Sequence, residues 1–289
     1  MLKQSISDSD GIPHIDGIEG IESITTNNIP AKKVNLLHVL LVTETWLPEV
    51  NGVAMSLGQL MHQFNLKGHN ISLLRPKPNH NSALSNSSES YFRVMQDISH
   101  DLQVKGMSIP KYKELQFGAP VYFKIKKHFQ QLQPDVVHIA TEGPLGLAAL
   151  WAAKTLNITV TTGYHTQFHD FSRHFGLGIL ARPMMAYFKW FHNASQATCV
   201  PSQKTFQDLD ALGFKRLYEV GRGVDLERFN PAHRSEALRA KWGAHSQHTV
   251  LLMVSRLSPE KGVDLVIKSF KALQQEQLHR VVKLVIVGD

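Results

Sequence analysis

Short apolar runs alternate along this chain with segments whose apolar residues recur at helical spacing, and this alternation constrains the fold most strongly. The run at 35–42, NLLHVLLV, is continuous, which is typical of a strand buried on both faces of a parallel sheet. A helical pattern follows over 53–67, and the next apolar run, HNISLLRP, begins at residue 69. Repeated units of this kind predict an α/β fold with a doubly wound parallel sheet.

The same alternation continues to residue 289. Further strands are expected in the apolar runs at 134–140, 157–165, 196–201, 248–257 and 281–289, and a short one at 91–95. Further helices are expected over 119–132, 143–156, 178–194, 202–214 and 258–277. Ser202 and Ser258 would be the N-caps of the last two helices, and residues 105–120 are expected to be irregular.

Changes in pattern divide the chain into four segments. Residues 1–33 read as a polar, disordered tail, and residues 34–225 contain a complete sheet. Residues 226–244 lack clear periodicity and are expected to be a linker. A second domain begins over 245–289 with a single strand–helix–strand unit, which is too short to bury a core of its own. We therefore expect that domain to continue beyond the sequence given.

Composition narrows the class of protein. The chain is 43% hydrophobic and carries a formal net charge of +7, which suits anionic ligands or an anionic membrane surface. No apolar run reaches the about 18 residues of a transmembrane helix, and the first thirty-three residues lack the apolar core of a signal peptide. We expect a cytoplasmic protein without a nucleic-acid partner. Cys199, the only cysteine, lies in an apolar run and is expected to be a buried strand residue.

Ligands of open α/β sheets bind at the carboxyl ends of the strands, and Gly52 lies between a strand end and a helix start. Free N–H groups and the helix dipole attract anions at such a place. The Asn51–Gly52 step also tolerates left-handed backbone angles, and Gly52 has no side chain to keep a ligand away. A phosphate site and an ordinary turn glycine are equally consistent with this pattern.

Three further candidates follow predicted strands. His165 closes the strand at 157–165, although a chain with 16 histidines has many without a function. Arg256 lies at a strand end, and Lys261 is expected in the first turn of the next helix, where a cation opposes the helix dipole by about 0.3–1 kcal/mol. A bound phosphate would offset that cost, and Arg with Lys is a common pairing for a diphosphate. Two solvated surface charges are the alternative reading.

Other motifs are absent or weak. The chain has no GxxxxGK[ST] phosphate loop, and GLGILA at 176–181 follows a loop instead of a strand, so it is a poor dinucleotide fingerprint. Asp208 and Asp210 fall inside a predicted helix, where a solvated face is more common than a metal site. The segment FKIKKHF at 123–129 mixes aromatic and basic residues and could rest on anionic lipid, with a plain exposed helix as the alternative.

Six segments together resemble glycosyltransferase family 4, whose members are retaining enzymes of the GT-B fold. The segments are TETWLPEVNGVAMSL (43–57), HIATEGPLGLAAL (138–150), GYHTQFHDFSRHFGLG (163–178), WFHNASQATCVPS (190–202), GRGVDLERFNP (221–231) and VSRLSPEKGVDLVIKSF (254–270). Within the family, the chain most resembles bacterial GDP-mannose-dependent α-mannosyltransferases and the glycolipid and sulfoquinovosyl transferases. The resemblance covers about residues 36–289.

The resemblance implies roles for residues that bind the donor. Gly52 would lie under the donor diphosphate, and His165 would contact the donor hexose and stabilise its developing positive charge. Arg256 and Lys261 would bind the diphosphate and stabilise the leaving group. No metal and no cofactor would then be needed, because these cations supply the electrostatic stabilisation that a metal ion would give.

The resemblance also implies how the two Rossmann-like domains divide the substrates. Residues 34–225 would bind the acceptor, with Asn51, Glu44 and Thr166 in its cleft, and the domain that begins at 245 would bind the donor. The family's second domain carries a pair of Glu residues at fixed spacing that holds the donor. This chain ends before that pair, so we expect the 289-residue chain alone to be inactive.

The expected reaction is transfer of a hexose, mannose or a related sugar, from a GDP- or UDP-sugar to a lipid or glycan acceptor with retention of configuration. The acceptor would be met in the cytoplasm, at the inner face of the membrane if it is a lipid. Two alternatives stay open. One is a non-catalytic GT-B-like binding subunit, and the other is a GT-B sugar-nucleotide epimerase that uses the same cleft.

Overall fold

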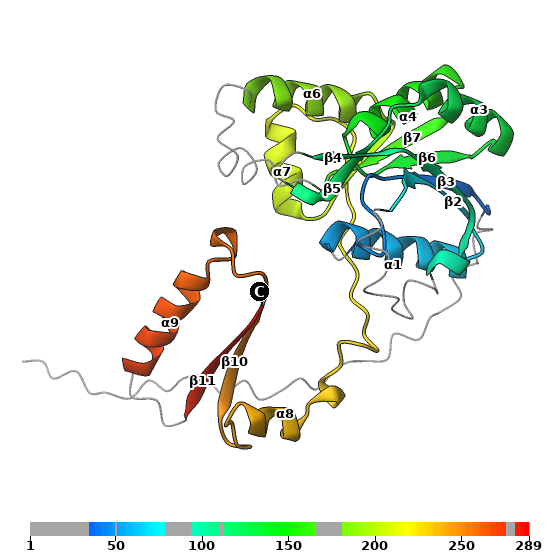
Figure 1. Cartoon of the computed structure of the whole chain (residues 1–289). Coiled ribbons are helices and arrows are strands. Elements are labelled where there is room, and N and C mark those ends of the chain that lie inside the picture. Colours follow the sequence, from blue (N-terminus) through cyan, green and yellow to red (C-terminus); the bar gives the residue numbers. More distant parts are fainter. Residues whose placement is uncertain are drawn as a thin grey trace, which may run out of the picture. The chain divides into compact units, whose positions relative to one another are not determined.

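A seven-stranded sheet is the largest sheet of the structure, a computed structural model (Figure 1). The described residues are 35–49, 51–78, 94–109, 112–165, 181–275 and 281–288. The strand order is β3-β2-β1-β6-β7-β8-β9, and every neighbouring pair is parallel. The strands span His38–Val42 (β1), Asn70–Pro76 (β2), Ile98–Val104 (β3), Val136–Ile139 (β6), Thr159–Gly163 (β7), Ala197–Val200 (β8) and Leu217–Glu219 (β9). The predicted α/β fold with a parallel sheet is thereby confirmed.

Helices cover both faces of this sheet, as Figure 1 shows for α1 on one side and for α3, α4 and α6 on the other. The helices span Gly52–Leu66 (α1), Tyr122–Leu132 (α3), Pro144–Thr155 (α4), Ala181–Asn193 (α6) and Gln203–Ala211 (α7). Leu40 and Val42 of β1 pack in the core with α3 and α4, and Val39 and Leu41 pack in the core with α1. The continuous apolar run of β1 therefore follows from the alternation of its side chains between two cores.

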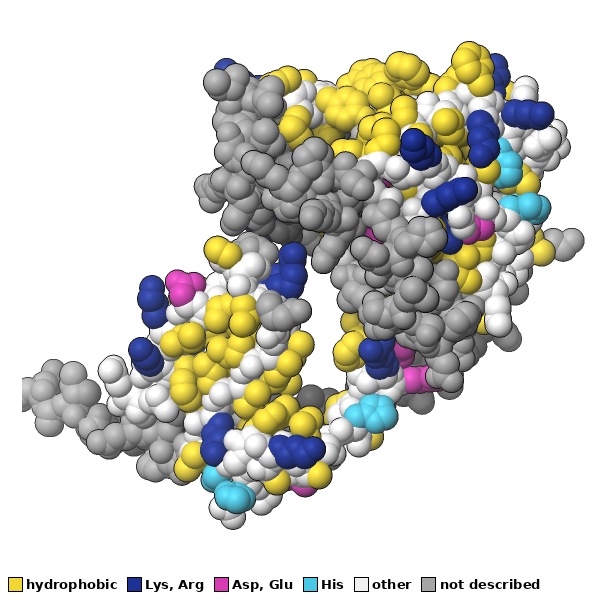
Figure 2. All heavy atoms as spheres, viewed as in Figure 1, with side chains coloured by type: hydrophobic (Ala, Val, Ile, Leu, Met, Phe, Trp, Pro, Cys, Tyr) yellow, Lys and Arg dark blue, Asp and Glu magenta, His cyan; other side chains and the backbone are white. Residues whose placement is uncertain are grey.

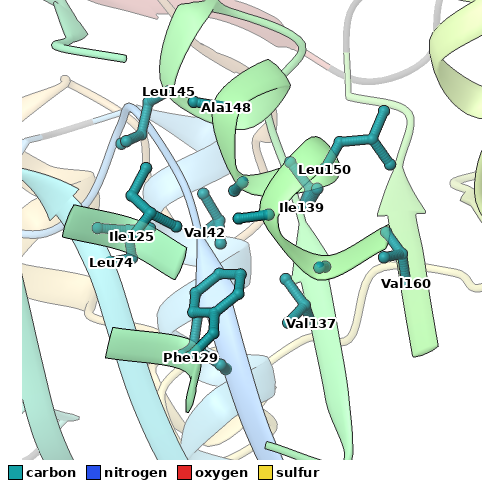
Figure 3. Packing of buried hydrophobic residues seen from close by; sticks show 14 of the residues in the cluster. Val42, Leu74, Ile125, Phe129, Val137, Ile139, Leu145, Ala148, Leu150 and Val160 are labelled. Atoms are coloured by element: carbon teal, nitrogen blue, oxygen red, sulfur yellow. The ribbon is translucent and has the colours of Figure 1, made fainter. Parts of the chain in front are cut away.

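The larger core lies between the sheet and α3, α4 and α6 (Figure 3). Ile125 and Phe129 of α3 point from the helix toward Val42 and Val137 of the strands, and all four side chains are fully buried. The small residues of α4, such as Ala149, let this helix lie close to β6 and β7. Burial of apolar surface stabilises the fold by about 25 cal/mol per Å². It holds in place the helical layer against which the site is built.

Local capping explains where two of the helices begin. The Ser202 side chain accepts a hydrogen bond from the Thr205 backbone N–H, which confirms its predicted role as the N-cap of α7. Asn51 has extended backbone angles and caps α1 with its side-chain oxygen. Both residues satisfy N–H groups that the first helical turn leaves without an intrahelical partner.

Two sequence predictions between β2 and α3 are wrong. Residues 94 and 95, expected in a strand, are helical, and the rest of 91–95 lies outside the described residues. The segment expected to be irregular forms an antiparallel hairpin, β4 (Gly106–Ile109) with β5 (Tyr112–Gly118). Both elements are short, and their apolar residues are not regularly spaced. Their helical or strand periodicity therefore cannot be recognised in the sequence.

The C-terminal part of the chain forms the predicted strand–helix–strand unit. β10 (Thr249–Val254) pairs in parallel with β11 (Val282–Val287), and α9 (Val263–Gln275) connects them. A 3₁₀ helix, η1 (Pro231–His233), and a short helix, α8 (Glu236–Lys241), lie within the predicted linker. The predicted domain boundaries stay predictions, and the tail at 1–33 lies outside the described residues.

The predicted start of α9 is wrong. Pro259, Glu260 and Lys261 form a separate 3₁₀ turn, η2 (Pro259–Lys261), Gly262 follows with a left-handed φ of 63°, and α9 begins only at Val263. Ser258 makes no side-chain capping bond. Gly262 allows the break because a residue without Cβ adopts this backbone conformation at little cost. Lys261 therefore does not oppose the dipole of α9 from within its first turn.

In the part of the chain that the structure describes, no helix combines the length and the apolar character needed to cross a membrane.

We expect Phe129→Ala to lower the free energy of unfolding by about 3–5 kcal/mol, because it leaves a cavity in the larger core. Phe123→Ala is the matched control, since Phe123 lies on the same helix but is 83% exposed. Its effect should stay within about 0.5 kcal/mol. Chemical denaturation measures both, and equal effects of the two changes would contradict the packing of α3 described above.

Candidate functional site

The carboxyl edge of the sheet brings together loops that are far apart in the sequence. β1, β6 and β7 are parallel and adjacent, with Val42 paired to Ile139 and Ile139 paired to Thr162. The residues that follow these three strands therefore lie at one edge. Gly52 follows β1 and His165 follows β7, so the prediction that both lie at the carboxyl edge is confirmed.

Asn51 organises the start of α1. Its Oδ1 accepts hydrogen bonds from the N–H groups of Val53 and Ala54, at 3.1 and 2.9 Å. Its Nδ2 donates to Thr45 Oγ1 at 2.6 Å. Asn51 thus uses both ends of its amide within the protein, and its predicted contact with an acceptor stays a prediction.

Gly52 does not adopt the left-handed conformation that the Asn51–Gly52 step would tolerate. Among the described residues it is absent from those with positive φ, and it is the first residue of α1. The reason is that Asn51 takes extended angles, with φ −140°, and acts as a cap. Because Gly52 has no side chain, it leaves space at the start of α1. A Cβ at this position would meet only Arg222 Nη1, at 3.7 Å, among the described atoms within 4 Å.

Arg222 is a cation that sequence reasoning did not single out. It lies shortly after β9, in the segment GRGVDLERFNP, and its guanidinium lies beside Gly52. Its charge also lowers the pKa of His165. The structure therefore adds an exposed arginine to the edge where an anion site was predicted.

His165 is a buried polar side chain at this edge whose ring nitrogens are left unpaired by the part of the chain that the structure describes. Among the described residues neither of its ring nitrogens has a hydrogen-bond partner, although both are buried. Leaving a buried polar group unpaired costs about 1–3 kcal/mol, which marks a group that a ligand could satisfy. Burial first and Arg222 second lower the pKa of His165, which favours the uncharged ring.

Gly163 allows this placement of His165. A Cβ on Gly163 would lie 2.5 Å from His165 Nε2 and 3.2 Å from His138 Nε2. No side chain fits there, so the last residue of β7 must be glycine for the two imidazoles to lie against the backbone. His138, on β6, bonds Thr161 Oγ1 through its Nδ1 at 2.9 Å.

A buried polar network lies behind the site. His192 Nε2 lies 3.1 Å from Glu142 Oε1, and His192 Nδ1 lies 2.9 Å from Thr162 Oγ1. The Tyr187 hydroxyl donates to the backbone oxygen of Glu142 at 2.6 Å. Glu142 raises the pKa of His165, which partly offsets the effects of burial and Arg222. Sequence reasoning missed Glu142 and His192, although both lie in segments that resemble the family.

Glu44 has a structural partner. Its Oε1 accepts a hydrogen bond from the Leu145 N–H at 3.0 Å, at the N-terminus of α4. A Cβ on Gly143 would lie 1.9 Å from Glu44 Oε2, so glycine is required beside this carboxyl group. Burial raises the pKa of Glu44 to about 7, and nearby Glu142 adds to the rise. The predicted contact of Glu44 with an acceptor stays a prediction.

The remaining candidates lie elsewhere. Arg256 follows β10 and Lys261 ends η2, so both belong to the C-terminal unit, and their shared use with His165 stays a prediction. Thr166 lies outside the described residues. Cys199 is partly buried on β8, and burial raises the pKa of its thiol. Within the described ranges, no group of three or more His, Cys, Asp or Glu side chains is placed to hold a metal ion.

Comparison with known proteins gives two consecutive family matches. Residues 50–228 match the family described as Glycosyltransferase Family 4, and residues 234–289 match the one described as Glycosyl transferases group 1. A protein of Mycobacterium tuberculosis named GDP-mannose-dependent alpha-mannosyltransferase is 31% identical over 253 residues, covering 88% of this chain and 63% of its own length.

A second relative is named alpha-monoglucosyldiacylglycerol synthase and comes from Streptococcus pneumoniae. It is 28% identical over 263 residues, covering 88% of this chain and 56% of its own length. The chain thus spans less than two thirds of each of these relatives. Among solved structures, a glycosyltransferase from Rickettsia africae ESF-5 superposes with a TM-score of 0.58 at 17% identity, covering 88% of this chain and 61% of that one, which shows a shared fold.

Two buried groups near the edge should give opposite dependences of stability on pH. Burial lowers the pKa of His138 from 6.5 to about 4, and nearby His165 contributes to this lowering. Between these values the unfolded chain binds more protons, so the His138 contribution is complete above pH 6.5 and is lost as the pH falls toward 4. For Glu44 the folded pKa is the higher, so its contribution is complete below pH 4.5 and is lost as the pH rises through 7.

We therefore expect the stability advantage of wild type over His138→Asn to shrink by up to about 3 kcal/mol as the pH falls through this window. The advantage over Glu44→Gln should shrink by a similar amount as the pH rises through its own window. Urea denaturation across the pH range measures both differences. If the difference in unfolding free energy between wild type and each variant does not change with pH, the burial of these groups is contradicted.

Proposed function

The chain belongs to glycosyltransferase family 4, and from this premise we propose that the protein is a retaining hexosyltransferase. It transfers mannose or a related hexose from a GDP- or UDP-sugar to a lipid or glycan acceptor. The relative from Mycobacterium tuberculosis is named for GDP-mannose and the one from Streptococcus pneumoniae for a glucosyl lipid, which supports this substrate class. The acceptor is met on the cytoplasmic side of the membrane if it is a lipid.

The observation that carries the proposal is the buried, unpartnered ring of His165. An imidazole at the carboxyl edge, with no hydrogen-bond partner among the described residues, can bond a hexose hydroxyl group that takes the place of water. Its lowered pKa favours the uncharged ring, which adds no positive charge beside the anomeric carbon. Positive charge develops on that carbon as the bond to the phosphate breaks, and a neutral polar ring can stabilise it.

Cations stabilise the other product of bond breaking, the nucleoside diphosphate. Arg222 lies beside the open space at Gly52, where the donor diphosphate would lie against the start of α1. Arg256 and Lys261 of the C-terminal unit supply further positive charge in the full-length protein. These groups stabilise the leaving phosphate without a metal ion, and the acceptor hydroxyl attacks from the same face that the phosphate leaves.

The test is a transfer assay on the full-length protein with His165→Ala. Incubation with GDP-mannose or UDP-glucose and a diacylglycerol acceptor should give an α-glycosylated lipid. His165→Ala should lower kcat by about 10²-fold or more with little change in donor KM, because its interaction grows only in the transition state. His100→Ala is the matched control, since that histidine is exposed on β3, and it should turn over like wild type.

Two outcomes would count against this proposal. If His165→Ala melts well below wild type but turns over normally, His165 is a packing residue. If the wild-type protein converts the sugar nucleotide into an epimer without transfer, the epimerase alternative replaces hexosyl transfer.

The phosphate-binding cations give a separate expectation. Arg256→Ala and Lys261→Ala in the full-length protein should each cost about 2–4 kcal/mol of transition-state stabilisation, the scale for one preorganised charge. Both should lower kcat/KM far more than they lower Tm. Lys268→Ala serves as control, because Lys268 lies on the exposed face of α9 and pairs with Asp264. Activity of the Arg256 and Lys261 variants within threefold of wild type would remove them from the site.

A further inference from the structure

Glu142 is a buried carboxyl group at the carboxyl edge of the sheet, and the reaction proposed above gives it no role. It is the third residue after Ile139 of β6, and His165 is the third residue after Thr162 of β7. Ile139 and Thr162 are paired in the sheet, so the two segments leave it side by side. Glu142, with 9% of its side chain exposed, therefore follows the strand next to the one that carries the unpartnered ring of His165.

His192 holds this carboxyl group in place. The imidazole is fully buried, its Nε2 lies 3.1 Å from Glu142 Oε1, and its Nδ1 lies 2.9 Å from Thr162 Oγ1. The ring also packs against Tyr164 and Phe214, whose ring centroids lie 5.4 and 5.8 Å away. Because both ring nitrogens have partners, the imidazole cannot turn without losing a buried hydrogen bond, and Glu142 keeps one orientation.

The second oxygen of the carboxyl group is open to a ligand. Among the described residues, Glu142 Oε2 has no hydrogen-bond partner, and it does not belong to the fully buried atoms that lack one. A carboxylate fixed by one oxygen, with the other free to accept, is arranged to act on a group that enters the site. The alternative is a pair that only holds α6 against the loop before α4, and it makes no use of this oxygen.

The negative charge of Glu142 acts on its neighbours at the edge. Burial raises the pKa values of Glu44 and Tyr187, and the charge of Glu142 raises them further. Burial and Arg222 lower the pKa of His165, and the charge of Glu142 opposes this lowering. Its electric field therefore extends over the place where a sugar bonded to His165 would lie.

The protein as a whole carries an excess of positive charge. The chain has 31 Lys and Arg for 24 acidic residues, and on the face that Figure 2 shows, Lys and Arg side chains are more frequent than Asp and Glu. Positive surroundings suit a nucleoside diphosphate, but they disfavour positive charge on a sugar. A buried carboxylate at the edge that carries His165 is placed to offset this effect.

We propose that Glu142 supplies the negative charge of the donor-sugar site. Its carboxylate, held by His192, stabilises the positive charge that develops on the hexose as the bond to the phosphate breaks. His165 contributes a neutral hydrogen bond to the same sugar, and Glu142 contributes the charge. The inference rests on the proposed function, because it assigns Glu142 a role within that reaction.

Binding of two sugar mimics beside GDP tests this role without any transfer step. Deoxymannojirimycin has a protonated ring nitrogen, whereas anhydromannitol has the same hydroxyl groups on an uncharged ring. Calorimetry of the full-length protein with GDP should show that wild type prefers the charged mimic. Glu142→Gln should weaken binding of the charged mimic by about tenfold and leave that of the neutral mimic unchanged. The corresponding mimics of glucose are used with UDP.

Transfer assays give a second readout. Glu142→Gln should lower kcat by about tenfold to a hundredfold with little change in the donor KM, because the charge acts on the transition state. Glu142→Asp keeps the charge and should recover part of the lost kcat and part of the preference for the charged mimic.

Asp97 supplies the matched control. Its Oδ2 lies 2.5 Å from His62 Nδ1, and both side chains are 13% exposed, so this is a second, mostly buried pair of a carboxyl group and an imidazole. Asp97 directly precedes β3 and therefore lies at the opposite, amino edge of the sheet. Asp97→Asn should lower Tm, as Glu142→Gln should, but its kcat and its affinities for both mimics should match wild type.

Three results would overturn the inference. Wild type could bind the two mimics equally or not at all, Glu142→Gln could lose affinity for both equally, or Glu142→Gln could melt well below wild type and yet turn over normally. The last result would make Glu142 a residue that only holds α6 against the loop before α4. If the preference for the charged mimic depends on Glu142 but no hexosyl transfer is found, the proposed transfer is wrong while the binding role of Glu142 is kept. If transfer is found and the mimics are bound equally, only this inference fails.

Discussion

The parallel pairing of β1 with β6, and of β6 with β7, is the constraint on which the rest of the structure depends. It places the ends of three strands at one edge, so that Gly52 and His165 lie at the same edge of the sheet although more than a hundred residues separate them. The pairing is stable because β1 is buried on both faces, with alternate side chains in the two helical layers. A polar substitution in β1 would therefore disturb the core and the site together.

The stability of this core allows the site to keep a polar group that folding alone would not leave unpaired. His165 is held without a hydrogen-bond partner in the described chain, against Gly163 and beside His138. Behind it, the bonds of His192 to Glu142 and Thr162 fix the neighbouring carboxylate. An unpaired buried ring costs free energy in the empty protein, and a ligand that forms the missing hydrogen bond removes this cost. Such a balance is characteristic of preorganised sites.

The sequence predicted the sheet well because the buried strands and the amphipathic helices each have a clear period. It predicted local geometry less well. The Asn51–Gly52 step tolerates left-handed angles, but Gly52 is helical because Asn51 forms the cap. Lys261 was expected within α9, but it lies in a separate 3₁₀ turn that ends at the left-handed Gly262. Glu142 and Arg222 were not singled out because their importance depends on contacts between segments distant in sequence, and no single-sequence pattern records such contacts.

The central claim is that the unpartnered ring of His165 receives the donor sugar. A crystal structure of the full-length protein with a non-transferable nucleotide-sugar analogue tests it most directly. The account predicts a hexose hydroxyl within about 3 Å of a His165 ring nitrogen and the diphosphate beside Gly52. A donor bound with its hexose away from His165, or a His165 ring still without a partner, would contradict the account.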